Sequence, residues 1–161
     1  MAETLAISAS DKASRYRELF PQLASLVDGE PDLIANLANI AAALRELLPI
    51  ASWVGFYIRR GDELVLGPFQ GKIACVRIAF GRGVCGTAAA ERRTVIVPDV
   101  EKFPGHIACD AGSRSEIVVP IVQNGRVVAV LDLDSYEVAA FDDVDAAGLA
   151  PIAELAGTFA W

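Results

Sequence analysis

Three cysteines and a histidine are the side chains of this sequence best suited to nucleophilic or redox chemistry: Cys75, Cys85, Cys109 and His106. Cys85 follows a glycine-rich turn at the expected start of a short helix, where the helix dipole favours the thiolate form. Cys109 lies in an expected loop three residues after His106, a spacing that can produce a catalytic Cys–His pair. A solvated loop histidine fits the same pattern. Cys75 lies on an expected strand, where a cysteine is often a small buried hydrophobe.

Zinc binding is the alternative use of these residues, because three cysteines and one histidine can make a tetrahedral ligand set. Cys75 and Cys85 are ten positions apart, whereas zinc knuckles usually have about two to four residues between paired cysteines. The spacing therefore disfavours zinc, and we expect no bound metal. An odd number of cysteines also leaves at least one thiol unpaired.

Three carboxylates are expected to meet at the ends of two paired strands. Asp132 and Asp134 are two residues apart, so on a strand their side chains point to the same face. Glu116 begins the preceding strand, and the hairpin signal Asn124-Gly125 between the two strands can bring it opposite Asp134. Clustered carboxylates suit a cationic group such as an amine, and crowding can raise one pKa so that a proton is held for acid catalysis. A solvated strand end fits the same residues.

Two aromatic side chains share one face of an earlier strand. Trp53 and Tyr57 alternate with Val54, Phe56 and Ile58, so the two sets point to opposite faces of a sheet. A Trp–Tyr wall can hold a small apolar part of a ligand, and ordinary core packing is the simpler interpretation.

The elements that must position these residues follow from the hydrophobic pattern. Apolar residues at helical spacing alternate with segments of period two. We expect helices at 11–27, 31–48, 83–90 and 142–161, and strands at 53–58, 63–66, 74–79, 94–97, 117–122 and 127–133. Segments 66–71 and 99–113 are expected loops. This order predicts an α+β fold, with a central antiparallel sheet of about six strands, the N- and C-terminal helices on one face and a loop-covered pocket on the other.

Length, charge and hydropathy limit the function classes. A chain of 161 residues is the size of one domain, with 1–12 expected as an N-terminal extension. Hydrophobic residues make up 53% of the chain, which excludes a disordered protein, and the net charge of -7 disfavours binding to nucleic acid or anionic lipid. No run reaches the about 20 apolar residues of a membrane span, and the first residues lack the basic region of a signal peptide. We expect a cytoplasmic protein without a membrane partner.

Taken together, six segments resemble the free methionine-R-sulfoxide reductases, the catalytic branch of the GAF-domain superfamily. They are Trp53–Tyr57, Leu66–Lys72, Gly83–Gly86, Phe103–Asp110, Ser115–Pro120 and Leu131–Ser135. The resemblance runs from about residue 15 to the C-terminus and includes all three cysteines in their local contexts. It implies a single GAF domain, with helices on one side of the sheet and the pocket under loops on the other.

The resemblance makes Cys109 the nucleophile. Its thiolate attacks the sulfoxide sulfur, methionine leaves and a sulfenic acid remains, which a second cysteine converts to a disulfide. Cys85 is the preferred second cysteine and Cys75 the alternative. Thioredoxin or another external dithiol then restores the thiols, and the family implies no bound cofactor.

The resemblance also assigns the other candidates to the substrate site. Glu116 and Asp134 are expected at the sulfoxide oxygen, and Asp132 at the substrate ammonium group. Trp53 and Tyr57 would hold the methyl end of the substrate. A pocket closed around the free amino and carboxylate groups would exclude methionine sulfoxide inside a peptide.

Two other classes of protein remain as alternatives, and a homodimer is the expected assembly. A non-catalytic GAF module that senses a small molecule or the redox state is the main alternative, and a structural zinc protein is the third class. The apolar N-terminal helices offer an interface for a homodimer.

Overall fold

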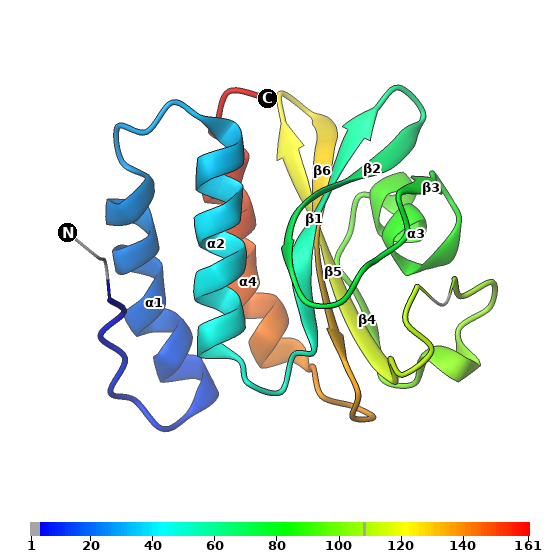
Figure 1. Cartoon of the computed structure of the whole chain (residues 1–161), viewed down its shortest axis with the longest axis horizontal. Coiled ribbons are helices and arrows are strands. Elements are labelled where there is room, and N and C mark those ends of the chain that lie inside the picture. Colours follow the sequence, from blue (N-terminus) through cyan, green and yellow to red (C-terminus); the bar gives the residue numbers. More distant parts are fainter. Residues whose placement is uncertain (1–3, 108) are drawn as a thin grey trace.

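A six-stranded antiparallel sheet runs through the molecule and separates two layers (Figure 1). The computed structural model describes residues 4–107 and 109–161. The strands follow the spatial order β3-β2-β1-β6-β5-β4, and every neighbouring pair is antiparallel. Their bounds are β1 Trp53–Arg60, β2 Glu63–Gln70, β3 Arg77–Ala79, β4 Val95–Val97, β5 Ser115–Gln123 and β6 Arg126–Ser135. The predicted α+β class with a central antiparallel sheet is confirmed.

Three helices form the layer on one side of the sheet: α1 (Lys12–Val27), α2 (Leu33–Leu47) and α4 (Asp143–Ala156). In Figure 1, α2 and α4 lie against the sheet and α1 lies outside them. The short helix α3 (Gly83–Glu91) lies on the other side, together with the 3-10 turn η1 (Val100–Lys102) and the long loops. The expected placement of the N- and C-terminal helices on one face is confirmed.

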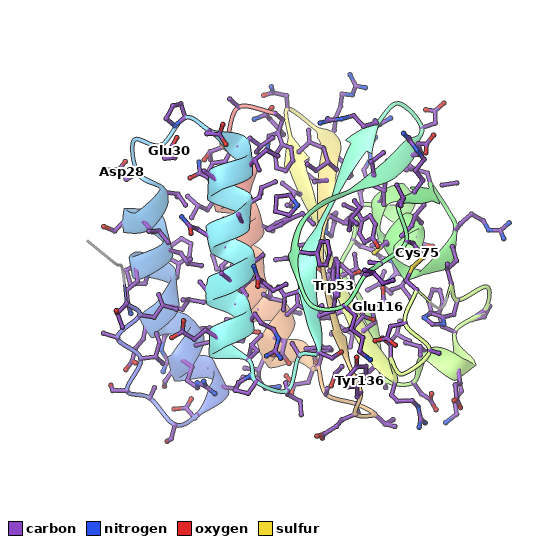
Figure 2. All side chains as sticks on the ribbon, viewed as in Figure 1. Asp28, Glu30, Trp53, Cys75, Glu116 and Tyr136 are labelled. Atoms are coloured by element: carbon purple, nitrogen blue, oxygen red, sulfur yellow. A yellow bond between two sulfur atoms is a disulfide. The ribbon has the colours of Figure 1, made fainter. Side chains whose placement is uncertain are left out.

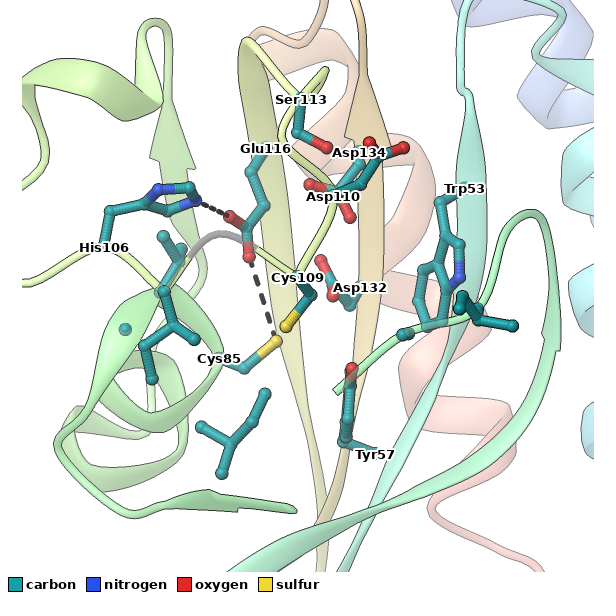
Figure 3. Close-up of a pocket in the computed structure, with 16 residues that line it drawn as sticks. Trp53, Tyr57, Cys85, His106, Cys109, Asp110, Ser113, Glu116, Asp132 and Asp134 are labelled. Atoms are coloured by element: carbon teal, nitrogen blue, oxygen red, sulfur yellow. Dashed lines mark hydrogen bonds and ion pairs between the residues drawn. The ribbon is translucent and has the colours of Figure 1, made fainter. Parts of the chain in front are cut away.

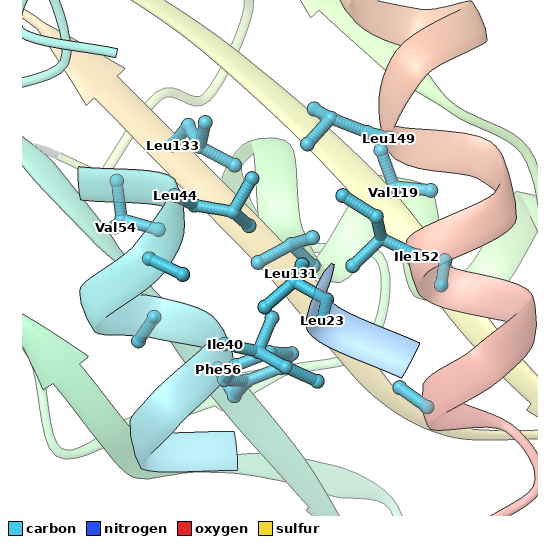
Figure 4. Packing of buried hydrophobic residues seen from close by; sticks show 14 of the residues in the cluster. Leu23, Ile40, Leu44, Val54, Phe56, Val119, Leu131, Leu133, Leu149 and Ile152 are labelled. Atoms are coloured by element: carbon cyan, nitrogen blue, oxygen red, sulfur yellow. The ribbon is translucent and has the colours of Figure 1, made fainter. Parts of the chain in front are cut away.

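Alternation along β1 assigns its side chains to two separate hydrophobic clusters. Val54, Phe56 and Ile58 belong to the cluster between the sheet and the helices, whereas Trp53 and Tyr57 belong to the cluster on the opposite face. Figure 4 shows the first cluster, in which side chains of α2 and α4 meet those of the central strands. Full burial of one such aliphatic or aromatic side chain contributes about 1.5–3 kcal/mol. The helical layer is therefore the main stabilising core, and the other face is left for the site.

A two-residue turn sets the register of β5 and β6. Asn124 and Gly125 both have positive φ, 50° and 73°, which is the backbone that a tight hairpin turn requires. The pairing that follows puts Glu116 opposite Asp134 and Val118 opposite Asp132. The predicted juxtaposition of Glu116 and Asp134 is confirmed.

Three elements differ from the sequence-based expectation. The expected helix 142–161 ends at Ala156 as α4. The expected loop 66–71 is largely strand, because β2 continues to Gln70 and pairs with β1 on both sides of an irregularity at 67–68. Pro68 is tolerated because it lies at this irregularity in the pairing with β1, and because β3 covers the other side of β2 only at 63–65. The expected strand 74–79 is shortened to β3, and Cys75 therefore lies in a loop.

The N-terminal segment is attached to α1 by side-chain hydrogen bonds. The amide of Ala6 donates to Gln22 and the amide of Ser8 donates to Glu18. Residues 1–3 of the expected extension 1–12 lie outside the described residues. Across the described residues, no helix combines the length and the apolar character needed to cross a membrane.

Candidate active site

A pocket lies on the face of the sheet opposite α1, α2 and α4 (Figure 3). Residues of β1, β3, β5 and β6 and the start of α3 line it, and two loops contribute the remaining residues. We call these the Cys75 loop (residues 71–76) and the Cys109 loop (described residues 103–107 and 109–114). Figure 2 shows Trp53, Cys75 and Glu116 grouped on this side of the molecule. The expected loop-covered pocket is present.

A disulfide joins the two loops. Cys75 is bonded to Cys109, with Cα atoms 5.3 Å apart and a sequence separation of 34. Cys85 is a free thiol, 3% exposed, in the first turn of α3. The preference for Cys85 as the partner of Cys109 is thus corrected in favour of Cys75. The physical reason is that Cys75 left the expected strand for a loop that meets the Cys109 loop, whereas Cys85 is fixed inside a helix.

Three carboxylates line the pocket from adjacent strands. Glu116 at the start of β5 and Asp132 on β6 are each 5% exposed. Asp134 lies two residues after Asp132, opposite Glu116, so all three side chains share one face of the sheet. Figure 3 shows them converging on the pocket.

Burial gives these carboxylates unusual proton affinities. It raises the pKa of Asp132 to about 7. Burial and, next, the charge of Asp132 raise the pKa of Glu116 and of Asp134 well above the ordinary value of each. Because the three groups interact, they share protons as a set, and the site retains protonated carboxyl near neutral pH.

Cys85 is a protonated thiol rather than a thiolate. Burial raises its pKa well above the ordinary value, and the nearby charges of Asp132 and Glu116 act in the same direction. The sequence-based expectation of a thiolate favoured by the helix dipole is therefore wrong. A helix terminus contributes about 0.3–1 kcal/mol, whereas removing a charge from water in a protein interior costs several kcal/mol. The thiol instead donates a hydrogen bond to Oε1 of Glu116 at 3.9 Å.

His106 contacts Glu116 and not the sulfur of Cys109. Its Nε2 lies 3.8 Å from Oε2 of Glu116, and burial lowers the pKa of the imidazole. The two carboxylate oxygens of Glu116 thus have different neighbours, the Cys85 thiol and the His106 ring. The Cys–His pair that the sequence spacing suggested is not formed in this disulfide state.

An aromatic wall closes the pocket on the β1 side. The rings of Trp53 and Tyr57 are stacked with centroids 5.9 Å apart, and Trp53 also stacks on Phe69 of β2 at 5.3 Å. Gly55 permits this arrangement, because a Cβ there would collide with Phe69 and the Trp53 ring. The Tyr57 hydroxyl donates to the carbonyl of Cys75 at 3.1 Å. The wall therefore also holds the Cys75 loop.

Three polar residues connect the two loops and were not identified from the sequence. The Tyr136 hydroxyl donates to Oδ2 of Asp110 at 2.6 Å, and Lys72 Nζ lies 3.6 Å from the same oxygen. Lys72 also lies over the Tyr136 ring, 4.9 Å from its centroid. The sequence offered only their positions as a signal for this role: Asp110 adjoins Cys109, and Tyr136 directly follows the end of β6. The contacts join the Cys75 loop, the Cys109 loop and the end of the sheet.

The zinc set considered from the sequence is not available in this state. Two of its four ligands, the sulfurs of Cys75 and Cys109, are bonded to each other. The described residues contain a different group of donors, formed by Cys85, Glu116 and Asp132.

Comparison with known proteins connects this geometry to a family. The GAF domain model matches residues 31–159. The free methionine-R-sulfoxide reductase of Escherichia coli (strain K12) is 50% identical over 139 residues, which cover 86% of this chain and 84% of the relative. GAF domain-containing protein A of Dictyostelium discoideum is 53% identical over 156 residues, covering 96% of this chain and 98% of the relative.

A solved structure agrees with the described fold over nearly the whole chain. It is the X-ray structure of free methionine-R-sulfoxide reductase from Neisseria meningitidis in complex with its substrate. The TM-score is 0.93 and the identity 54%, with 96% of this chain and 93% of the other covered. The family resemblance expected from the six sequence segments is confirmed.

Proposed function

The chain belongs to the free methionine-R-sulfoxide reductases of the GAF-domain family, and we propose that it reduces free methionine-(R)-sulfoxide with Cys109 as the nucleophile. The observation that carries the proposal is the Cys75–Cys109 disulfide at a pocket lined by buried, proton-holding carboxylates. A thiol pair is the reductant that a sulfoxide needs, and a neutral carboxyl is the acid. We take the whole chain as one GAF domain.

The reaction begins with the reduced thiols. The Cys109 thiolate attacks the sulfoxide sulfur, the oxygen is transferred to Cys109 as a sulfenic acid, and methionine leaves. Cys75 then attacks the sulfenic sulfur, water leaves and the disulfide forms. An external dithiol exchanges with this disulfide and regenerates both thiols. In sum, one sulfoxide and one dithiol give methionine, water and one external disulfide, and the chemistry uses no bound cofactor.

Glu116 and Asp134 are the proton donors for the sulfoxide oxygen in this proposal. A sulfoxide oxygen departs only when it is protonated or strongly hydrogen-bonded, and burial keeps these two groups protonated to a higher pH than in water. Cys85 and His106 hold the two oxygens of Glu116. We assign Cys85 this positioning role instead of the resolving role that the sequence favoured.

Asp132 binds the substrate ammonium group, and the aromatic wall contacts the methyl end. Oδ1 of Asp132 is buried and has no hydrogen-bond partner among the described residues, as expected for an acceptor whose donor is the substrate. Trp53 is paired opposite Asp134 on the neighbouring strand and forms an apolar wall of the pocket with Tyr57. In this proposal the wall fixes which epimer presents its oxygen to the carboxylates. Enclosure of the amino group excludes sulfoxides within a peptide chain.

The reductant, the assembly and the compartment complete the proposal. We assign thioredoxin or a similar dithiol as the external reductant, because the disulfide lies at loops instead of in the core. We place the protein in the cytoplasm, where such reductants keep thiols reduced. The helical layer is the face that we assign to a homodimer contact.

Turnover of separated epimers tests the proposal. The reduced protein should convert the R epimer of free methionine sulfoxide to methionine and leave the S epimer, with methionine measured by chromatography. Cys109→Ser should release no methionine. Cys75→Ser should release about one methionine per chain in the first turnover and accumulate a sulfenic acid, detected by mass after trapping.

Two results would overturn the assignment. Methionine release by Cys109→Ser would show that another group is the nucleophile. Binding of the sulfoxide by the folded, reduced wild type without any turnover would favour the non-catalytic GAF sensor.

A further inference from the structure

Three potential metal ligands from three different elements converge at the bottom of the pocket. They are the sulfur of Cys85 in α3 and carboxylate oxygens of Glu116 in β5 and Asp132 in β6. These donor atoms all lie within 4.8 Å of one another, and the exposed fractions of the residues are 3%, 5% and 5%. Figure 3 shows the Cys85 sulfur and both carboxylates pointing into the same space.

Asp132 lacks the partner that a buried carboxylate needs. Its Oδ1 is shielded from solvent, and none of the residues that the structure describes forms a hydrogen bond with it. Among the ion pairs and histidine–carboxylate contacts of the described residues, His106 is the partner of Glu116, and Asp132 takes part in none. A buried acceptor without a donor is unfavourable and is usually satisfied by a ligand, an ion or water. The cluster therefore combines converging donors with an oxygen that is free to bind a cation.

We propose that Cys85, Glu116 and Asp132 form an inhibitory site for a thiophilic divalent cation of the Zn²⁺ or Cd²⁺ type. Zinc binds sulfur at about 2.3 Å and carboxylate oxygen at about 2.0–2.2 Å, so a tetrahedral ion holds the two ligand atoms about 3.6 Å apart. The Cys85 sulfur and Oε1 of Glu116 are 3.9 Å apart, close to this separation. A carboxylate oxygen of Asp132 lies within 4.8 Å of both other donor atoms and is the third ligand in this proposal, and the fourth position is left for water.

The donor types select the class of cation. A sulfur ligand favours zinc-like soft cations, whereas Mg²⁺ and Ca²⁺ require six or more oxygen ligands. Binding of the ion releases the protons that Cys85 and Glu116 hold in its absence, and the divalent charge then largely neutralises the thiolate and the two carboxylates. Mg²⁺ is therefore the discriminating control cation.

The site is independent of the redox-active cysteines. Cys75 and Cys109 are bonded to each other and contribute no ligand. The cation can therefore bind the oxidised enzyme, and this binding does not depend on the proposed function. Inhibition does rest on the proposed function, because Glu116 and Asp132 are the groups assigned there to the substrate.

Metal binding to the disulfide form is the direct test. Zn²⁺ is titrated in competition with a chromophoric chelator, and Co²⁺ is added separately to detect sulfur-to-cobalt charge-transfer absorption. We expect one ion per chain and a charge-transfer band, with no competition by millimolar Mg²⁺. Cys85→Ser should abolish the band and weaken Zn²⁺ binding by more than about tenfold, since even the loss of an outer partner weakens metal sites by about 10–100-fold.

Asp132→Asn and Asp134→Asn form a matched pair on the same strand. Asp132→Asn should weaken Zn²⁺ binding by more than about tenfold, whereas Asp134→Asn, which removes the same charge beside the donor group, should change it by less than about threefold. If Cys85→Ser does not fold, judged by circular dichroism, the cobalt band and this carboxamide pair decide the question.

Three outcomes would overturn the site. They are no Zn²⁺ binding by the disulfide form, unchanged binding in folded Cys85→Ser, and binding that appears only after reduction, which would assign the ion to Cys75 and Cys109. Competition with free methionine sulfoxide tests the inhibitory part separately. If Zn²⁺ binds with the expected variant pattern but substrate does not compete, the metal site stands, and the inhibition and the substrate placement are both wrong.

Discussion

Reduction of the Cys75–Cys109 disulfide is expected to lower the free energy of unfolding by a calculable amount. The bond closes a loop with a sequence separation of 34. The loop-entropy relation then gives about 3.8 kcal/mol at 25 °C, and residual structure in the unfolded chain makes this an upper value. For a domain of this length, such a difference corresponds to a Tm shift of about 8–15 °C.

Thermal and urea unfolding measure this difference directly. The wild type is unfolded with and without a reductant, and the disulfide content is verified by mass in each sample. Cys75→Ser should unfold at the lower temperature under both conditions, because it cannot form the bond. Cys85→Ser is the matched control, since it removes a thiol that is not in the disulfide, and its response to reductant should equal that of the wild type.

Two results would refute the reasoning. A wild type whose Tm does not respond to verified reduction would show that the bond does not constrain the unfolded chain as calculated. Loss of the response in Cys85→Ser would show that Cys85, and not Cys75, is the partner of Cys109.

The remaining predictions concern a carboxylate, a helix contact and the loop connection. Burial raises the pKa of Asp132 to about 7 from 3.8, so its proton contributes stability that is complete below about pH 4 and is lost as the pH rises through about 7. Urea midpoints should fall over this range, and less so in Asp132→Asn; equal slopes would contradict the assignment. In Gly148→Ala, the new Cβ would collide with the Tyr16 ring, which should lower the free energy of unfolding by about 1–3 kcal/mol; an unchanged urea midpoint would contradict this contact. Tyr136→Phe removes the 2.6 Å hydrogen bond to Asp110 and should slow disulfide formation about fivefold, equivalent to about 1 kcal/mol. In quenched single-turnover samples of Tyr136→Phe, the rate of methionine release should equal that of the wild type. Equal slowing of methionine release and of disulfide formation would contradict a role of Tyr136 confined to the two cysteine loops.

The parts of the site that local sequence patterns determine were predictable. The two-residue turn at Asn124-Gly125 fixes the pairing of its strands, so Glu116 could be placed opposite Asp134 before any coordinates. The period of two in β1 likewise separated Trp53 and Tyr57 from the core side chains of the same strand. Both inferences concern residues whose relative positions follow from a short stretch of regular backbone, a hairpin in one case and a single strand in the other.

The cysteine chemistry was less predictable because it depends on tertiary contacts. The choice between Cys75 and Cys85 depended on whether residues 74–76 pair as strand or turn away as a loop. Tyr57 decides this, since its hydroxyl binds the Cys75 carbonyl across 18 positions of sequence. The predicted thiolate form of Cys85 was wrong for a related reason. The sequence showed that Cys85 lies at the start of a helix, but it did not show that the thiol is buried beside Glu116 and Asp132.

The pairing of β2 with its neighbours explains why the expected loop 66–71 is strand. A Gly–Pro pair inside a segment predicts a loop, because proline cannot donate to a strand ladder. Pro68 lies beyond the three residues of β2 that pair with β3, where that ladder has already ended. The irregular pairing with β1 at 67–68 and the early end of the β3 ladder, which no local pattern encodes, together allow this proline within a strand.

The two hydrophobic clusters on opposite faces of the sheet have no residue in common. Substitutions at separated sites without shared partners add in free energy, so packing changes in α1, α2 and α4 can compensate for destabilising changes around the pocket. Directed evolution toward other sulfoxides can therefore be divided between two libraries. One library would raise thermal tolerance from the helical side, and the other would vary the Cys75 loop, the Cys109 loop and the aromatic wall to alter substrate selectivity.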